Sequence, residues 1–222
     1  MTGFWRQVHT VIMRDLRRER RTAEVLGVTI PFGATAIILI GFVLSANTDT
    51  LRKAGPAILW GIVFLFGTLV AVRRTAAETP AQRDMLALTG ADPAAMWVGQ
   101  AAASALFMIL FQVIVGIAGF LFLGFSVPMW WSIPVVIVLV GIGLAALGTL
   151  AGWIAHDLET GTALVPLIVA PLAIPLLLGA SKTLDVLVTN RGILRWIVLM
   201  MVVDLVVIII GVLAARPLQE NP

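Results

Sequence analysis

The sequence predicts an all-α integral membrane protein, with six transmembrane helices preceded by an amphipathic interfacial N-terminal helix. Of its 222 residues, 60% are hydrophobic and 12% are charged, whereas soluble domains carry about 25% charged residues. The chain also contains six long apolar runs, and about 20 apolar residues suffice to cross a bilayer. We therefore expect a cytoplasmic elbow helix over residues 1–27 and a single six-helix transmembrane domain over residues 28–222.

Residues 4–26 are predicted to form a helix that lies in the headgroup layer. An apolar stripe with spacings of three, four or seven residues runs along it: Trp5, Val8, Ile12, Leu16, Ala23 and Leu26. Arginines crowd the remaining surface: Arg6, Arg14, Arg17, Arg18, Arg20 and Arg21. This pattern is typical of a helix on an anionic leaflet. The alternative is a solvated segment whose arginines only set the orientation of the first span.

The apolar runs place the six spans at about residues 28–46, 56–72, 93–124, 133–154, 162–178 and 194–215. The polar run 47–50 is expected to break the first span, and Pro56 suits the first turn of the second. The paired residues Trp130 and Trp131 indicate a membrane interface before the fourth span. Pro217 is expected to end the sixth.

The third span is longer than the membrane requires. At 1.5 Å per residue it measures about 48 Å, well over the ~30 Å hydrocarbon core. Asp92 and Pro93 are a typical N-cap and first helical residue, so they are expected to open this helix. Its first turns, with Trp97 and Gln100, should project into or below the headgroups.

The polar loop over residues 73–93, between the second and third spans, is predicted to contain a short helix. Thr79 and Gln82 form a capping box, with Pro80 at the first helical position between them. Gly90 stands where a helix would end in the left-handed conformation. We expect a rigid helix of about ten residues that a cytoplasmic partner binds and moves. The predicted coupling residues are Thr79, Pro80, Gln82, Arg83, Met85 and Leu88.

The distribution of basic residues predicts the orientation in the membrane. Six spans put both termini on one side, and ten of the fifteen lysines and arginines fall on that side. Basic residues are enriched in cytoplasmic loops. We therefore expect a multi-pass protein of the cell (plasma or inner) membrane, with both termini and the loop 73–93 in the cytoplasm.

Several kinds of chemistry find no support in the sequence. The chain contains no cysteine, which excludes disulfides and thiolate chemistry. It carries no nucleotide-binding or hydrolytic motif, so we expect no enzyme, and ATP hydrolysis only in a partner subunit. The pI near 10.5 reflects arginines that set membrane orientation rather than nucleic-acid binding. His9 and His156 form no helical pair, so we expect surface residues rather than metal or haem ligands.

Asp204 is the most informative single residue, because it is an acid within the sixth span. Acids at membrane depth are costly and suggest a pathway, a relay or a partner contact. The alternative is an acid that a wet cavity or a neighbouring helix satisfies, or that stays protonated. Gln112 and Ser104 are other polar residues within the third span. Both are expected to form hydrogen bonds to a neighbouring helix. The lack of a second intramembrane acid argues against a proton-coupled carrier.

The fifth span contains three prolines, Pro166, Pro171 and Pro175. Each removes a backbone donor, and the freed carbonyls are tolerated only where protein or water meets them. We therefore expect a kinked helix that faces the protein or a subunit interface. Broken helices also line transport paths, so that role remains open.

These features together, with no ATPase motif, resemble the permease subunits of ABC-2-type transporters. Three segments carry a closer likeness: FWRQVHTVIMRDLRRERRTAEVLG at the start, AGPAILWGIVFLFGTLVAVRR in the second span, and GTALVPLIVAPLAIPLLLGAS in the fifth. They are similar to the haem exporter protein B family of cytochrome c maturation (CcmB-like). The chain departs from that family's pattern at Val72, where an acid is usual, and in the turn 156–161, which is acidic rather than basic.

The resemblance implies a permease subunit for haem export or delivery in cytochrome c maturation, driven by a separate ATPase. Its implied partners are a cytoplasmic ABC ATPase, a second copy of the permease, a haem-handling membrane protein and a haem chaperone, besides membrane lipids. Haem is implied as the candidate substrate, and no cofactor is expected to be bound by this chain. The alternatives are an ABC-2 permease for a lipid, polysaccharide or drug, or a non-transporting membrane scaffold.

Overall fold

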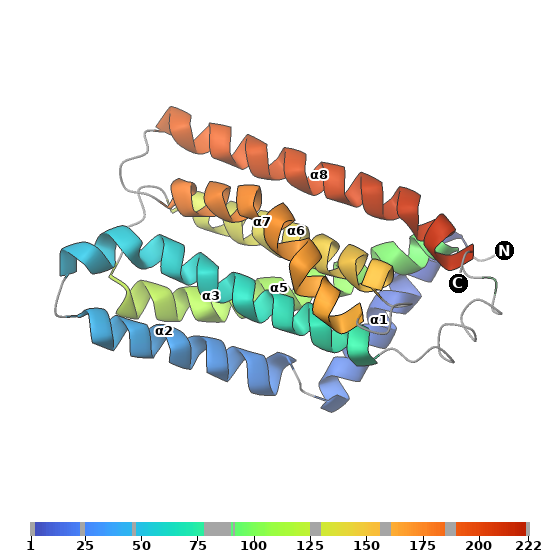
Figure 1. Cartoon of the computed structure of the whole chain (residues 1–222), viewed down its shortest axis with the longest axis horizontal. Coiled ribbons are helices and arrows are strands. Elements are labelled where there is room, and N and C mark those ends of the chain that lie inside the picture. The colour runs from blue at the N-terminus through green and yellow to red at the C-terminus, as the bar shows by residue number, and fades with distance from the viewer. Residues whose placement is uncertain are drawn as a thin grey trace.

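The computed structural model is a bundle of long helices (Figure 1). It describes residues 3–22, 25–45, 48–77, 90, 92–124, 130–155, 161–184 and 190–220. The elements in these ranges are α1 (Phe4–Thr22), the π-helical turn η1 (Val25–Thr29), α2 (Ile30–Leu44), α3 (Thr48–Ala77), α5 (Pro93–Phe122), α6 (Ser132–Ala155), α7 (Gly161–Thr183) and α8 (Asn190–Glu220). Six of the described helices are long and apolar enough to cross a membrane, which confirms the predicted fold class.

The helix boundaries differ from the sequence prediction mainly at prolines. α3 already begins at Thr48 and contains Pro56 inside it, so the prediction that Pro56 stands in the first turn of this helix was wrong, although the apolar part Lys53–Arg73 lies close to the predicted span. α8 likewise continues through Pro217 to Glu220, although Pro217 was expected to end it. A proline removes one backbone donor, and near a membrane surface water can bind the single carbonyl that it frees. The start of α5 at Pro93 is as predicted.

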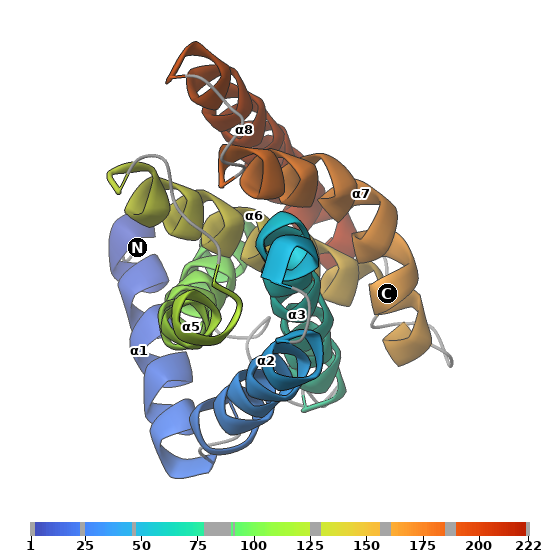
Figure 2. The ribbon, with the colours of Figure 1, turned by 90° about the vertical axis from the view of Figure 1, so that its left-hand side faces the viewer.

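Helix α6 occupies the centre of the bundle and packs against α3, α5, α7 and α8 (Figure 2). Small residues along it are buried, and small residues allow close packing of helices: Gly141, Gly143, Ala145, Gly148 and Gly152. A Cβ added at Gly141 would lie 2.7 Å from Ile109 of α5, and one at Gly148 would lie 2.8 Å from Ala71 of α3. The glycines of α6 therefore let two different helices approach its backbone.

Helix α1 lies across one end of the bundle, transverse to the long helices and at the end where both termini lie (Figure 1). It packs on α5, with Val8 and Val11 buried, and a Cβ at Gly99 would lie 2.6 Å from Val11. Trp5, in contrast, is 75% exposed. The predicted apolar stripe is therefore divided: part of it faces α5, and Trp5 is left for the headgroup layer.

Helices α5 and α8 meet where Trp97 lies against Gly211. Trp97 is 1% exposed, and a Cβ at Gly211 would overlap its indole ring. We predict that Gly211→Val lowers the melting temperature of the purified protein, because overpacking a tight contact costs roughly 1–3 kcal/mol. Gly61→Val is the control, since nothing lies within 4 Å of a Cβ there. Equal melting temperatures for the two variants would contradict this contact.

Candidate functional site

The six predicted coupling residues lie outside the described residues, because the structure does not describe residues 78–89. What it describes is the two ends of this loop. α3 ends at Ala77, and Gly90 has a φ of 66°, the left-handed conformation that was predicted for it. The predicted coupling residues, which all lie in 78–89, are Thr79, Pro80, Gln82, Arg83, Met85 and Leu88.

Asp92, near the end of this loop, connects three helices. Its Oδ1 accepts a hydrogen bond from the backbone N–H of Ala94 at 3.0 Å, so it is the N-cap of α5, as predicted. Its own backbone N–H donates to Oε1 of Gln7 in α1 at 2.9 Å. Its Oδ2 lies 3.8 Å from Nη2 of Arg216 in α8. The loop's exit is therefore attached to α1 and α8 as well as to α5.

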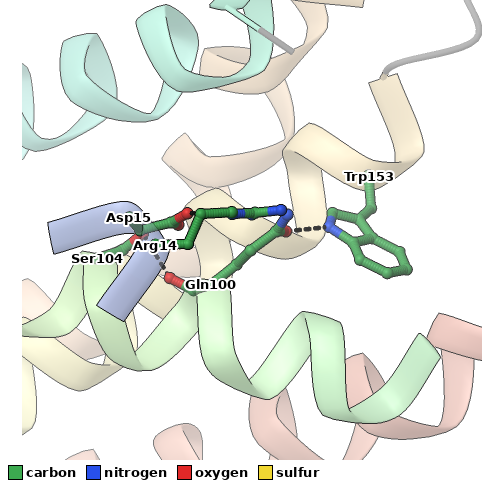
Figure 3. Close-up of polar contacts among 5 residues, drawn as sticks. All are labelled: Arg14, Asp15, Gln100, Ser104 and Trp153. Atoms are coloured by element: carbon green, nitrogen blue, oxygen red, sulfur yellow. Dashed lines mark hydrogen bonds and ion pairs between the residues drawn. The ribbon is translucent and has the colours of Figure 1, made fainter. Parts of the chain in front are cut away.

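A second polar contact lies deeper on the same side of α5. Oε1 of Gln100 accepts a hydrogen bond from the indole Nε1–H of Trp153 in α6 at 2.7 Å, and both residues are buried. Oγ of Ser104 donates to the backbone carbonyl of Gln100 at 2.8 Å. Arg14 and Asp15 of α1, whose side chains are 3.0 Å apart, complete the cluster drawn in Figure 3. Gln100 therefore lies inside the helix bundle, below the cover of α1.

Gln112 forms a similar link one layer further along α5. It is 2% exposed. In the orientation that gives both its amide nitrogen and its amide oxygen a partner, it forms two hydrogen bonds to the backbone of α6. Its nitrogen donates to the carbonyl of Ile137 and its oxygen accepts from the N–H of Gly141, at 3.2 Å each. This is the inter-helix role that the sequence predicted for it.

Asp204 lies inside the bundle, between α6, α7 and α8. It is 4% exposed, and both its Oδ1 and the side chain of Leu176 lie against Gly143 of α6. Within the described residues neither carboxylate oxygen has a hydrogen-bond partner. This differs from Gln100 and Gln112, whose polar groups are paired. A buried and unpaired acid needs a specific explanation, so Asp204 remains a candidate functional residue.

The prolines of α7 do not face the bundle of this chain. The helix was expected to face the protein or a subunit interface, and the second of these stays a prediction. Pro166 and Pro171 are exposed and Pro175 is half-buried. The physical reason is the packing of a different seam, formed by Val165, Val169, Ala173, Leu176 and Ala180, all of them buried. Because the prolines fall off this seam, their rings lie on the outer surface of α7.

No metal centre is formed by the residues that the structure describes. They contain no group of three or more His, Asp or Glu side chains that could hold a metal ion. His9 is exposed on α1, and His156 lies outside the described ranges.

Sequence reasoning missed the pairings at the Asp92 end of the bundle. It identified Asp92 as a cap, but it did not single out Gln7, Arg216 or Trp153. One signal was available for Gln100. It is an amide within a long apolar helix, and an amide buried there needs a hydrogen-bond partner. Nothing local to Asp92 indicates a bond to a residue 85 positions earlier.

Comparison with known proteins gives one match that covers nearly the whole chain. The model of the family described as CcmB protein matches residues 6–218, from α1 to the end of α8. No curated protein and no solved structure matches the chain.

The bond between Gln100 and Trp153 predicts a non-additive pair of substitutions. We expect Gln100→Leu to lower the stability by about 1–3 kcal/mol, because it leaves the Trp153 N–H buried without this acceptor. Adding Trp153→Phe removes that donor, so the double variant should be more stable than the sum of the two single effects. Denaturant titration of the four proteins in one detergent measures this. Strict additivity would show that the bond does not connect α5 to α6.

Proposed function

This chain belongs to the CcmB protein family, and we propose that it is the permease subunit of a haem-exporting complex driven by a separate ATPase. Membership of this family implies a haem-exporter permease role in cytochrome c maturation. The six span-length helices, in turn, make it a multi-pass membrane protein. The family match over residues 6–218 is the single observation that carries the proposal.

We place the driving contact at the loop 73–93. The chain carries no nucleotide-binding motif, so a partner must supply the energy of ATP hydrolysis. In this proposal a cytoplasmic ABC ATPase binds the helix predicted over residues 80–89. Support comes from Asp92, two residues after Gly90, which connects this loop to α1 and α8. A displacement of the loop would then act on three helices together.

Helix α5 is the element that would carry this displacement across the membrane. Its 30 residues span about 45 Å at 1.5 Å per residue. Side chains of Gln100 and Gln112 bind it to α6 at two levels, and Trp97 packs it against α8. Because these contacts hold α5 along much of its length, a movement at its cytoplasmic end would reach its far end.

The remaining partners and the orientation are part of the same proposal. The excess of arginine near the termini favours a cytoplasmic location for both termini and for α1, in the inner or plasma membrane. We propose that a second copy of this permease, a haem-handling membrane protein and a haem chaperone complete the complex, with haem as its substrate. Asp204, buried between α6 and α8, is the candidate for a transport-related role within the membrane.

Charged substitutions in the predicted coupling helix should separate ATPase binding from membrane insertion. We predict that Met85→Glu or Leu88→Glu removes the ATPase from the purified tagged complex, because an apolar docking contact cannot bury an unpaired charge. The permease itself should still be found in the membrane fraction. Met13→Glu is the matched control, since Met13 is 41% exposed on α1 at the same end of the bundle.

The purified complexes also test the substrate. The wild-type complex should show a haem absorption band and an ATPase activity that the loop variants lose. A variant that still copurifies with the ATPase at full activity would refute the assignment of the coupling helix. An ATPase that a lipid, polysaccharide or drug stimulates, with no haem in the complex, would favour an ABC-2 permease for another substrate. A complex without nucleotide turnover would favour a scaffold.

A further inference from the structure

An apolar pocket of about 320 Å³ lies at the end of the bundle opposite the termini. It is formed by α3, α5 and α6, with Leu184 beyond the end of α7, and Figure 2 views the bundle from this end. Its lining includes Trp60 and Val63 of α3, Gly116 and Phe120 of α5, and Ile137 of α6, with Trp130 just before α6. Nothing in the proposed function uses this pocket.

The pocket opens sideways, toward the surface that faces lipid. Ile117 and Leu121 line it and are 59% and 68% exposed, as expected of side chains that meet hydrocarbon in a membrane-spanning helix. Phe120 and Trp130 form its outer rim, with their rings packed edge to face at 5.5 Å. Tryptophan is enriched at the level of the headgroups, so the pocket begins at the membrane interface and runs inward.

The pocket is elongated and open to the hydrocarbon around the protein. From Leu121 to Gln112 it extends over nine residues of α5, about 13 Å at 1.5 Å per residue. Its exposed lining residues Ile117 and Leu121 leave it accessible to the lipid tails beside it. We propose that the pocket binds one acyl chain of a phospholipid from the adjacent leaflet, with the headgroup outside at the level of Trp130.

The chemistry of the lining agrees with this occupant. Among the described residues, every lining side chain is uncharged, and Gln112, the one amide, is bonded to α6. Burying an ionised headgroup there would be costly, whereas an acyl chain needs no polar partner. The described lining also lacks histidine, methionine and tyrosine, so it provides no axial ligand for a haem iron. The proposed lipid site is therefore separate from haem handling.

Gly116 allows the pocket to be filled by a single substitution. Nothing lies within 4 Å of a Cβ placed there, so Gly116→Leu puts a side chain into open space. Gly61→Leu is the matched control: Gly61 has the same open surroundings but does not line the pocket. Val113→Trp is a second filling variant, at a lining position that is 40% exposed and so tolerates a larger side chain.

The test is photo-crosslinking in phosphatidylcholine vesicles that contain a phosphatidylcholine with a diazirine on one acyl chain. In the wild type and in Gly61→Leu, we expect labelling of the half-buried lining residues Ile133 and Ile137. In Gly116→Leu and Val113→Trp this labelling should fall well below the wild-type level, while labelling of exposed residues such as Leu213 persists and reports folded, inserted protein.

Two results would overturn the lipid site. The first is unchanged labelling of Ile133 and Ile137 in both filling variants. The second is a haem absorption band, on titration of the vesicles with haemin, that the wild type and Gly61→Leu develop and the filling variants lack, because the pocket would then bind a porphyrin. Neither result depends on an ATPase, so failure here is distinguishable from failure of the proposed transport function.

Discussion

In a bilayer a polar side chain has no water to bind, and this constraint determines how the helices of this chain are connected. Amides inside the bundle are paired with α6: Gln100 with the indole of Trp153, and Gln112 with the backbone at Ile137 and Gly141. Because an unpaired amide would be costly at membrane depth, these bonds fix the position of α5 along α6. Apolar packing alone gives no such register, since lipid tails are as apolar as the helix surfaces.

At the end of the bundle where the termini lie, water can reach polar groups and this constraint is weaker. Charged side chains contact each other there. Asp92 is hydrogen-bonded to Gln7 and lies near Arg216, so a single residue connects α1, α5 and α8. An exposed ion pair of this length contributes little stability. Its importance is geometric, because Asp92 lies near the end of the loop 73–93, on which we propose that the ATPase acts. In this proposal the contacts of Gln100 and Gln112 would transmit a movement received at Asp92.

Much of this architecture could be predicted from the sequence, because length and hydropathy locate membrane spans almost independently of their partners. The cap at Asp92 and the left-handed Gly90 were predictable for the same reason: each depends on a few adjacent residues. Proline misled the prediction at Pro56 and Pro217, because the helix continues through both residues. The contact of Gln7 with Asp92 was out of reach, since it depends on how α1 lies across the bundle.

The central claim of the proposed mechanism is that α1 and α5, which meet at Asp92, would move as one body when an ATPase partner binds nucleotide. Cysteine pairs for spin labels can be introduced without removing any native cysteine. One pair joins Met13 of α1 to Leu106 of α5, and the other joins Met13 to Leu167 of α7, all of them exposed. On addition of ATP to the assembled complex, the account predicts an unchanged distance between Met13 and Leu106 and a shifted distance between Met13 and Leu167. A shift between Met13 and Leu106, with the distance to Leu167 constant, would contradict it.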